Sequence, residues 1–246
     1  MGAFVGAMHA RGMDPKEIDA HCYEEWLRRS PLTDYRLPRT SLIRAVRVRE
    51  MFMRLLPGTI EALPLDFFCV SCDLLQGAQV VHRRGWLAHA VSASMCLPGL
   101  CPPSVGEDGR LLIDGGILNN LPVDVMSQTG EGPVIAVDVT ARFDFAGDDG
   151  SETQGRKPGR SLAEWPWDDD RPVPTFAETL TRLITIASVD SKEAARLHAD
   201  LLIVPGNDDV GVLEFHQLDR MRDAGRRAAL AALDDASPEL LSRLAG

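Results

Sequence analysis

The sequence predicts an α/β fold, in which a layered, mostly parallel β-sheet is flanked by helices. Short apolar runs that are typical of strands alternate with segments of helical periodicity. The run PVIAVDV, at 133–139, is continuously aliphatic, as parallel strands that are covered on both faces usually are. With 246 residues, 45% of them hydrophobic, the chain can bury the core of one such domain. We therefore expect a single domain over residues 1–246.

Helices are expected in the first quarter of the chain. The first covers the small and apolar residues 3–12 and ends at Gly12, a usual residue after a helix. The second begins with an N-cap aspartate, a proline in the first turn and a glutamate three positions after the cap, and runs to about Arg29. Those three residues are Asp14, Pro15 and Glu17. A loop over 30–40 and a basic amphipathic helix over 42–56 follow.

Strands and helices alternate in the rest of the chain. Apolar runs predict strands over 66–72, 78–83, 110–113, 133–139 and 199–205. Helical patterns cover 86–95, 175–196 and 215–233. Residues 143–174 are rich in Gly, Asp, Ser and Pro, and we interpret them as a flexible insertion in the domain.

Composition narrows the classes of function. The net charge of −10, from 26 basic and 36 acidic side chains, does not favour binding of nucleic acid. The five cysteines leave one unpaired in any disulfide scheme, which fits a reducing compartment. Cys69 and Cys72 fall in an expected buried strand, so we interpret the cysteines as buried apolar residues and expect neither a metal nor a cofactor.

The sequence also bears on membranes. No apolar run reaches the roughly 18 residues of a membrane span, and the amino end lacks the pattern of a signal peptide, so a cytoplasmic location is the default expectation. Eight arginines between residues 28 and 54, together with Trp165 and Trp167, leave open a peripheral contact with a membrane surface. An ordinary solvated surface is the alternative in both places.

The stretch LLIDGGILNNLP, at 111–122, carries the residues that suggest chemistry. Asp114 ends an expected strand, and ligands of α/β sheets bind in the crevice beyond the carboxyl ends of parallel strands. Gly115 and Gly116 permit positive φ angles and a close approach, while Asn119 and Asn120 can cap the following helix. A structural turn, in which Asp114 bonds only to the backbone, explains the same spacing, so both interpretations stay open here.

Three motifs in order, SASMCLPGLCPP, DGRLLIDGGILNNLPVDV and PVIAVDV, resemble the patatin-like phospholipases, in particular the branch related to neuropathy target esterase. The resemblance runs through much of 63–139 and more loosely to the last helix. It implies a patatin-like fold and a serine hydrolase with a Ser–Asp dyad, whose serine attacks an acyl ester while the aspartate accepts its proton. By position that aspartate is Asp114. The implied substrate is a phospholipid or a lysophospholipid.

The chain departs from this family pattern at its amino end. The family's nucleophile lies in a Gly-Xaa-Ser-Xaa-Gly elbow, a motif that is absent from this sequence. Residues 2–12 resemble the helix after such an elbow, with Gly2 as its last glycine, so the serine would precede Met1 by one residue. We therefore expect a partial domain without its first strand and its oxyanion loop, with apolar surface exposed along 3–8.

Alternatives to an active lipid acyl hydrolase remain. The chain is either a catalytically silent protein that keeps a lipid-binding scaffold or a fragment that shows no esterase turnover as written. Ser71, Ser92 and Ser94 lack the flanking glycines of an elbow and are weak substitutes for the nucleophile. A dinucleotide-binding enzyme lacks support, because no Gly-Xaa-Gly-Xaa-Xaa-Gly motif follows a strand. The sequence determines neither the acyl preference nor the oligomeric state.

Overall fold

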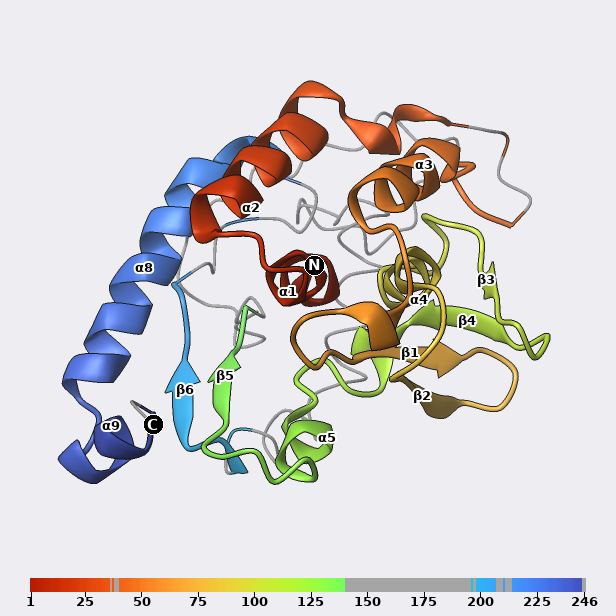
Figure 1. The fold of residues 1–246 in the computed structure, drawn as a ribbon. Helices are drawn as coiled ribbons and strands as arrows, with labels where there is room; N and C mark the ends of the chain where they lie inside the picture. Colours follow the sequence, from red (N-terminus) through yellow and green to blue (C-terminus); the bar gives the residue numbers. More distant parts are fainter. Residues whose placement is uncertain are drawn as a thin grey trace, which may run out of the picture.

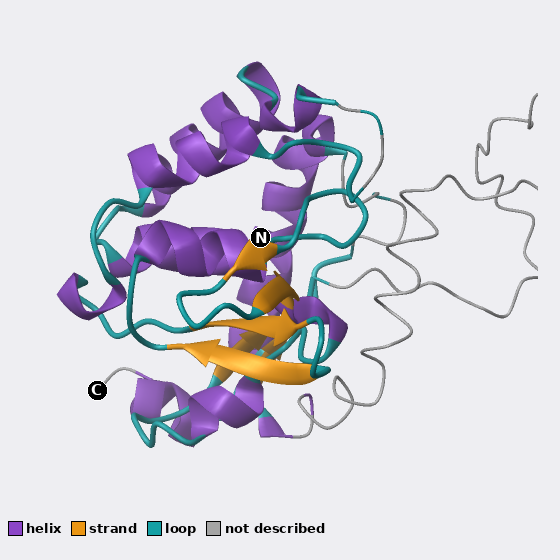
Figure 2. Ribbon diagram, turned by 90° about the vertical axis from the view of Figure 1, so that its right-hand side faces the viewer, coloured by secondary structure: helices purple, strands orange, loops and turns teal. Residues whose placement is uncertain are grey.

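A computed structural model of the chain describes residues 1–35, 37, 40–139, 196, 198–206, 210 and 214–244. Within these residues, helices pack around a four-stranded sheet and a separate two-stranded sheet (Figure 1). A view turned by 90° shows helices on both sides of the strands (Figure 2). The predicted α/β class is confirmed. The insertion expected at 143–174, and all but the end of the helix expected at 175–196, lie outside the described residues.

Within the described residues the predicted helices and strands are present, together with a short strand at 104–105 and a helix at 238–244 that were not predicted. The α-helices are α1 (Gly2–Ala10), α2 (Pro15–Cys22), α3 (Val46–Leu55), α4 (Leu87–Ser94), α5 (Val123–Ser127), α8 (Leu218–Asp234) and α9 (Pro238–Leu244), and a π-helical segment, η1 (Tyr23–Arg28), continues α2. The 3₁₀ turns are η2 (Pro31–Thr33), η3 (Ile60–Ala62), η4 (Gly115–Ile117) and η5 (Phe215–Gln217). The strands are β1 (Cys69–Asp73), β2 (Ala78–His82), β3 (Ser104–Val105), β4 (Leu111–Asp114), β5 (Ile135–Val137) and β6 (Leu201–Ile203). Among the described helices, none combines the length and apolar character needed to span a bilayer.

The direction of the strands differs from the prediction. The larger sheet has the order β2-β1-β4-β3, and each neighbouring pair in it is antiparallel, whereas β5 and β6 are parallel. The expectation of a mostly parallel sheet is therefore wrong for the described strands. Short turns through Gly77 (φ +61°) and Gly109 (φ +81°) join β1 to β2 and β3 to β4, and such turns can connect only antiparallel neighbours. Both β2 and β4 are antiparallel to β1, so they run in the same direction. Their carboxyl ends therefore lie at the same end of the sheet.

β5 differs from the prediction in its burial. Ala136 is buried, but Ile135 and Val137 on the other face are 48% and 49% exposed. The aliphatic run at 133–139 is therefore covered on one face only, and the expectation of two covered faces is wrong. Continuous aliphatic sequence shows that a strand is apolar, but the cover on each face depends on segments far away in the chain.

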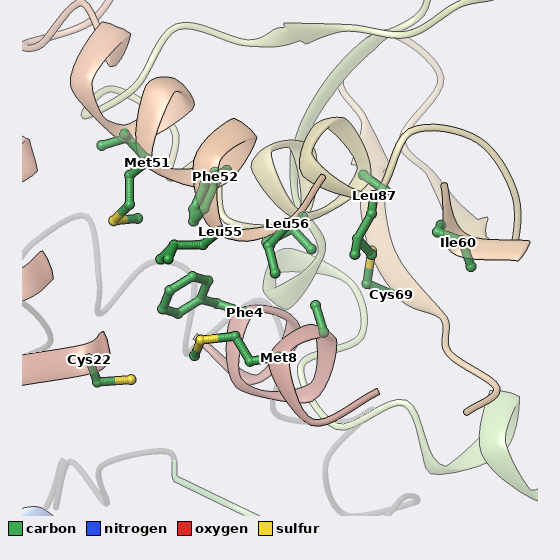
Figure 3. Packing of buried hydrophobic residues seen from close by; sticks show 14 of the residues in the cluster. Phe4, Met8, Cys22, Met51, Phe52, Leu55, Leu56, Ile60, Cys69 and Leu87 are labelled. Atoms are coloured by element: carbon green, nitrogen blue, oxygen red, sulfur yellow. The ribbon is translucent and has the colours of Figure 1, made fainter. Parts of the chain in front are cut away.

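α1 lies inside the main hydrophobic cluster (Figure 3). Phe4, Ala7 and Met8 have no exposed surface, and the ring of Phe4 packs 6.0 Å from that of Trp26 and 5.5 Å from that of Phe52. The expectation that this helix exposes its apolar side chains is wrong, because helices α2, α3 and α4 cover it. Of the large apolar residues here, Met1 and Val5 remain exposed, at 44% and 40%.

α3 begins four residues later than predicted. Leu42 and Ile43 donate backbone hydrogen bonds to Gly99 and Leu100, at 2.9 and 3.0 Å, instead of entering the helix. Ala45 then has a φ of +59°, which separates this short pairing from the helix. Amphipathic periodicity could not reveal the contact, because its partner lies more than fifty residues away in the chain.

Several of the described arginines between residues 28 and 54 lie beside carboxylates. Arg54 donates to both carboxylate oxygens of the buried Glu25 at 2.7 Å. Arg28 and Arg29 lie within 3.6 Å and 3.3 Å of the Glu24 carboxylate. Part of the positive charge in this window is therefore compensated by neighbouring carboxylates, and the idea of a lipid-facing patch here stays a prediction.

The predicted start of α2 is confirmed in detail. Asp14 Oδ1 accepts hydrogen bonds from the backbone N–H groups of Lys16 and Glu17, at 2.7 and 2.9 Å. The Glu17 carboxylate in turn accepts the N–H of Asp14 at 2.9 Å, which completes a capping box.

Replacement of Asp14 by alanine is expected to lower the free energy of unfolding by about 1 kcal/mol, because the first turn of α2 loses its cap. Urea denaturation followed by circular dichroism measures this change. Lys16→Ala is the matched control, since it alters an exposed side chain in the same turn but keeps the backbone donor, and we expect a change below about 0.5 kcal/mol. Equal effects of the two substitutions would contradict the role of the cap.

Candidate active site

Asp114 is the last residue of β4 and is partly buried. Its backbone N–H donates to the carbonyl of Cys96 at 2.9 Å, and its Oδ1 accepts the N–H of Gly116 at 2.7 Å. The chain turns immediately into η4, so the carboxylate lies at the point where the strand ends and the backbone reverses. One carboxylate oxygen is thus held by the turn.

The carboxylate of Asp114 lies near the amino end of α1. Burial raises the pKa of the Asp114 carboxyl above its usual value, while the ammonium group of Met1 and the Gly116 N–H lower it. Burial also lowers the pKa of the Met1 amino group, and the charge of Asp114 raises it. Met1 and Asp114, which are 113 positions apart in the sequence, therefore lie close together. The amino end of a helix favours negative charge, so α1 favours the ionised form of this carboxylate. The catalytic role of Asp114 stays a prediction.

A cavity of about 920 Å³ opens at this place. Its lining includes Met1, Gly2, Asp114, Gly116, Asn119 and Asn120. Apolar walls come from Ala3, Leu63, Leu65, Phe67, Val70 and Met126. A large pocket that combines apolar walls with converging polar groups is a usual form of a small-molecule site. The structure thus brings Asp114, Gly116, both asparagines and the amino end of α1 to one cavity.

The two glycines after Asp114 allow close packing. Neither of them has a positive φ angle. A Cβ atom on Gly115 would lie 2.3 Å from the carbonyl oxygen of Val70. A Cβ atom on Gly116 would lie 2.8 Å from Asn120 Oδ1 and 3.0 Å from Asp114 Oδ1. The predicted close approach is confirmed, and neither glycine uses the positive φ angle that its residue type permits.

Asn119 does not cap α5 with its side-chain oxygen. Its Nδ2 donates to Gln79 Oε1 on β2 at 3.0 Å and to Asp124 Oδ1 in α5 at 2.8 Å, and the residue is 7% exposed. The residue before α5 is Pro122, which provides no side-chain cap. The expectation of a capping asparagine is therefore wrong for Asn119, which instead ties the turn after Asp114 to a strand two positions away in the sheet.

Gly2, the expected remnant of the elbow, lines the cavity and starts α1. A Cβ atom added there would meet no other atom within 4 Å. The packing of the described residues therefore does not explain why this position is glycine, and its relation to an elbow stays a prediction.

The serines within the chain lie in different surroundings. Ser71, on β1, is 1% exposed and its Oγ lies 2.7 Å from His82 Nε2. Ser94 ends α4 and lines the same cavity as Asp114, but no hydrogen bond joins the two within the part of the chain that is described. The contact between Ser71 and His82 was not predicted, because nothing in the sequence links a mid-strand serine to a histidine eleven residues later.

The five cysteines are all buried and unpaired. Burial raises the pKa of the Cys69 and Cys96 thiols to about 12, and that of the Cys22 and Cys101 thiols to about 11. These groups are protonated near neutral pH and are poor nucleophiles. The interpretation of the cysteines as buried apolar residues is confirmed. Among the described residues, no cluster of three or more His, Cys, Asp or Glu side chains is arranged to hold a metal ion.

Comparison with known proteins places these features in context. A family model described as patatin-like phospholipase matches residues 1–127, just over half of the chain. The chain is 39% identical over 243 residues to an uncharacterized NTE family protein of Mycobacterium tuberculosis, covering 98% of this chain and 41% of that protein.

Two relatives from eukaryotes are also similar. Patatin-like phospholipase domain-containing protein 6 of Homo sapiens is 31% identical over 241 residues, with 92% of this chain and 17% of that protein covered. Lysophospholipase NTE1 of Mycosarcoma maydis is 32% identical over 195 residues, with 76% of this chain and 10% of that protein covered. The chain thus spans less than half the length of each of these relatives.

Proposed function

Because this chain belongs to the patatin-like phospholipase family, we propose that it provides most of the catalytic domain of a lipid acyl hydrolase that cleaves phospholipids or lysophospholipids. The observation that carries this proposal is the position of Asp114 beside the amino end of α1, in a cavity with apolar walls. The name of the Mycosarcoma maydis relative, a lysophospholipase, supports the same class of substrate.

The proposed nucleophile is a serine one residue before Met1 in a longer chain, within a Gly-Xaa-Ser-Met-Gly elbow. Its Oγ forms a bond to the acyl carbonyl carbon while Asp114 accepts the hydroxyl proton. The ester bond to the glycerol oxygen then breaks, and that oxygen takes the proton from Asp114. Water then gives a proton to the same carboxylate and attacks the acyl carbon. The bond to the serine Oγ breaks, Oγ takes that proton back, and the fatty acid leaves. The amino end of α1 favours the negative charge that develops beside it.

The direct test uses the chain extended by the residues that its gene encodes before Met1. We expect those codons to specify the elbow, and the extended protein to release fatty acid from a lysophospholipid. Replacement of the elbow serine by alanine should abolish release, and the 246-residue chain itself should show none. Unchanged hydrolysis after that replacement, or no hydrolysis by the extended protein, would contradict the proposal.

The acid limb of the pH profile provides a second expected result. In a longer chain the Met1 nitrogen is an uncharged amide, so the ammonium charge that lowers the pKa of Asp114 is lost while burial still raises it. A general base must be ionised, so kcat/KM should fall as the pH drops through a pKa above the usual aspartate value. Initial rates across the acid range measure this. A profile that stays flat down to the ordinary aspartate range would contradict the assignment.

A catalytically silent, lipid-binding protein is the alternative proposal. It predicts binding to phospholipid vesicles by the extended chain without release of fatty acid. A cytoplasmic location with peripheral contact at the membrane belongs to both proposals, because either protein binds membrane lipids. Co-sedimentation with vesicles, run beside the hydrolysis assay, separates the two.

A further inference from the structure

Two arginines lie at the same end of the sheet as Asp114, where β2 and β4 both finish. Arg83 and Arg84 follow β2 directly, and β2 runs in the same direction as β4, which ends at Asp114 (Figure 1). β1 separates the two strands, so strand spacing and rise place the backbones on the order of 10–15 Å apart. Both arginines line the cavity that contains Asp114.

Both guanidinium groups lie at the surface in the described part of the chain. Arg83 and Arg84 are exposed, and within the described ranges no carboxylate lies at ion-pair distance from either. The Arg83 guanidinium lies 5.1 Å from the centroid of the Phe68 ring, which also lines the cavity. This cation–π contact holds Arg83 against the wall and leaves its N–H groups able to donate.

Other charges in the cavity favour Arg83 over Arg84. Hydrogen bonds from its own backbone and from Gly85 lower the pKa of the Glu61 carboxyl, and the charge of Arg84 lowers it further. Arg84 is thus partly compensated by Glu61. Asp66, Asp114 and Glu131 also line the cavity, so carboxylates outnumber its two arginines, and both of these arginines lie at the end of β2.

We propose that Arg83, assisted by Arg84, binds the phosphate of a glycerophospholipid headgroup while the acyl ester lies at Asp114. The inference rests on the proposed function and names the side chains of this site that recognise the phosphate and so select phospholipids over neutral glycerides. Guanidinium groups match the phosphate group with two parallel hydrogen bonds. Asp114 and both arginines line the same cavity, with backbones on the order of 10–15 Å apart, and Leu65 and Met126 provide apolar wall for an alkyl chain.

The test is calorimetric and needs no nucleophile, so it uses the 246-residue chain. The probes are an ether-linked lysophospholipid, an ether-linked monoalkylglycerol with the same alkyl chain, and glycerol 3-phosphate, each below its aggregation concentration. Arg83→Gln should weaken binding of the ether lysophospholipid roughly tenfold, as loss of a charge-assisted contact does, and Arg84→Gln somewhat less. Binding of the monoalkylglycerol should stay unchanged, and Arg83→Lys should recover part of the loss.

Arg28→Gln is the matched control, because it removes an exposed arginine that does not line the cavity, and it should have no effect on any probe. Equal weakening of both ether lipids by Arg83→Gln, or no weakening at all, would overturn the inference. If glycerol 3-phosphate binds as tightly as the ether lysophospholipid, the arginines recognise a soluble phosphate compound. That result would overturn the assignment to a lipid. The two proposals can fail separately. If the extended chain hydrolyses no ester but lipid binding still depends on Arg83, the proposed function is overturned and this inference stands.

Discussion

Replacement of Asp114 by asparagine in the extended chain is expected to lower kcat/KM for a lysophospholipid by about 10³-fold, as loss of a general base does. Asparagine has nearly the same volume, and its Oδ1 can still accept the N–H of Gly116, so the turn should persist. What is lost is the ability to take the proton of the attacking hydroxyl. Burial already disfavours the charged form of Asp114, so the substitution should not lower the free energy of unfolding.

Ser94→Ala and Ser71→Ala are the controls for this prediction. Ser94 lines the same cavity, and Ser71 is a buried serine next to a histidine, but neither is the proposed nucleophile. Both variants should keep nearly the full kcat/KM in the continuous fatty-acid assay, with unfolding temperatures recorded in parallel. Full activity in Asp114→Asn, or a loss in Ser94→Ala as large as the one expected for Asp114→Asn, would show that the base or the nucleophile has been assigned wrongly.

Replacement of Gly115 by alanine is expected to lower the free energy of unfolding by about 3 kcal/mol, at the upper end of the cost of overpacking. The new Cβ would lie 2.3 Å from the carbonyl oxygen and 2.9 Å from Cγ2 of Val70. Val70 belongs to β1, which is paired on both sides by β2 and β4, so its backbone cannot move without breaking hydrogen bonds of the sheet. Urea denaturation of the 246-residue chain, followed by circular dichroism, measures the change.

Gly225→Ala provides the matched control. Gly225 lies within α8, where an added Cβ meets no atom within 4 Å. Since alanine has the higher helix propensity, this variant should gain about 0.5–1 kcal/mol. A Gly115→Ala protein as stable as the parent chain would mean that the turn after Asp114 is not packed against β1 as described.

Features that depend on neighbouring residues were predictable from the sequence. The capping box of α2 was predicted because Asp14 and Glu17 lie three positions apart and supply both of its hydrogen bonds. The end of β4 at Asp114 was placed within one residue, since an apolar run stops there at a charge and two glycines. In each case the interacting groups lie within a few residues of one another.

Features that depend on distant residues were not predictable in this way. The antiparallel pairing of β1 with β4 joins residues about forty positions apart, and no local pattern encodes strand direction. The hydrogen bond from Asn119 to Gln79 spans forty positions and replaces the expected cap. A glycine can serve either unusual dihedral angles or a close approach, and the sequence does not tell which; Gly115 serves the close approach and has no positive φ. The role expected for Asp114 came from the family resemblance and not from spacing.

The central claim is that Asp114 activates a hydroxyl located at the amino end of α1. Its most direct test is to label the extended chain with a fluorophosphonate and to identify the modified residue by peptide mass mapping. The account predicts one phosphonylated serine, immediately before Met1, with much slower labelling in Asp114→Asn. Labelling of Ser94 or of another serine, or ester hydrolysis that continues without any label, would contradict it.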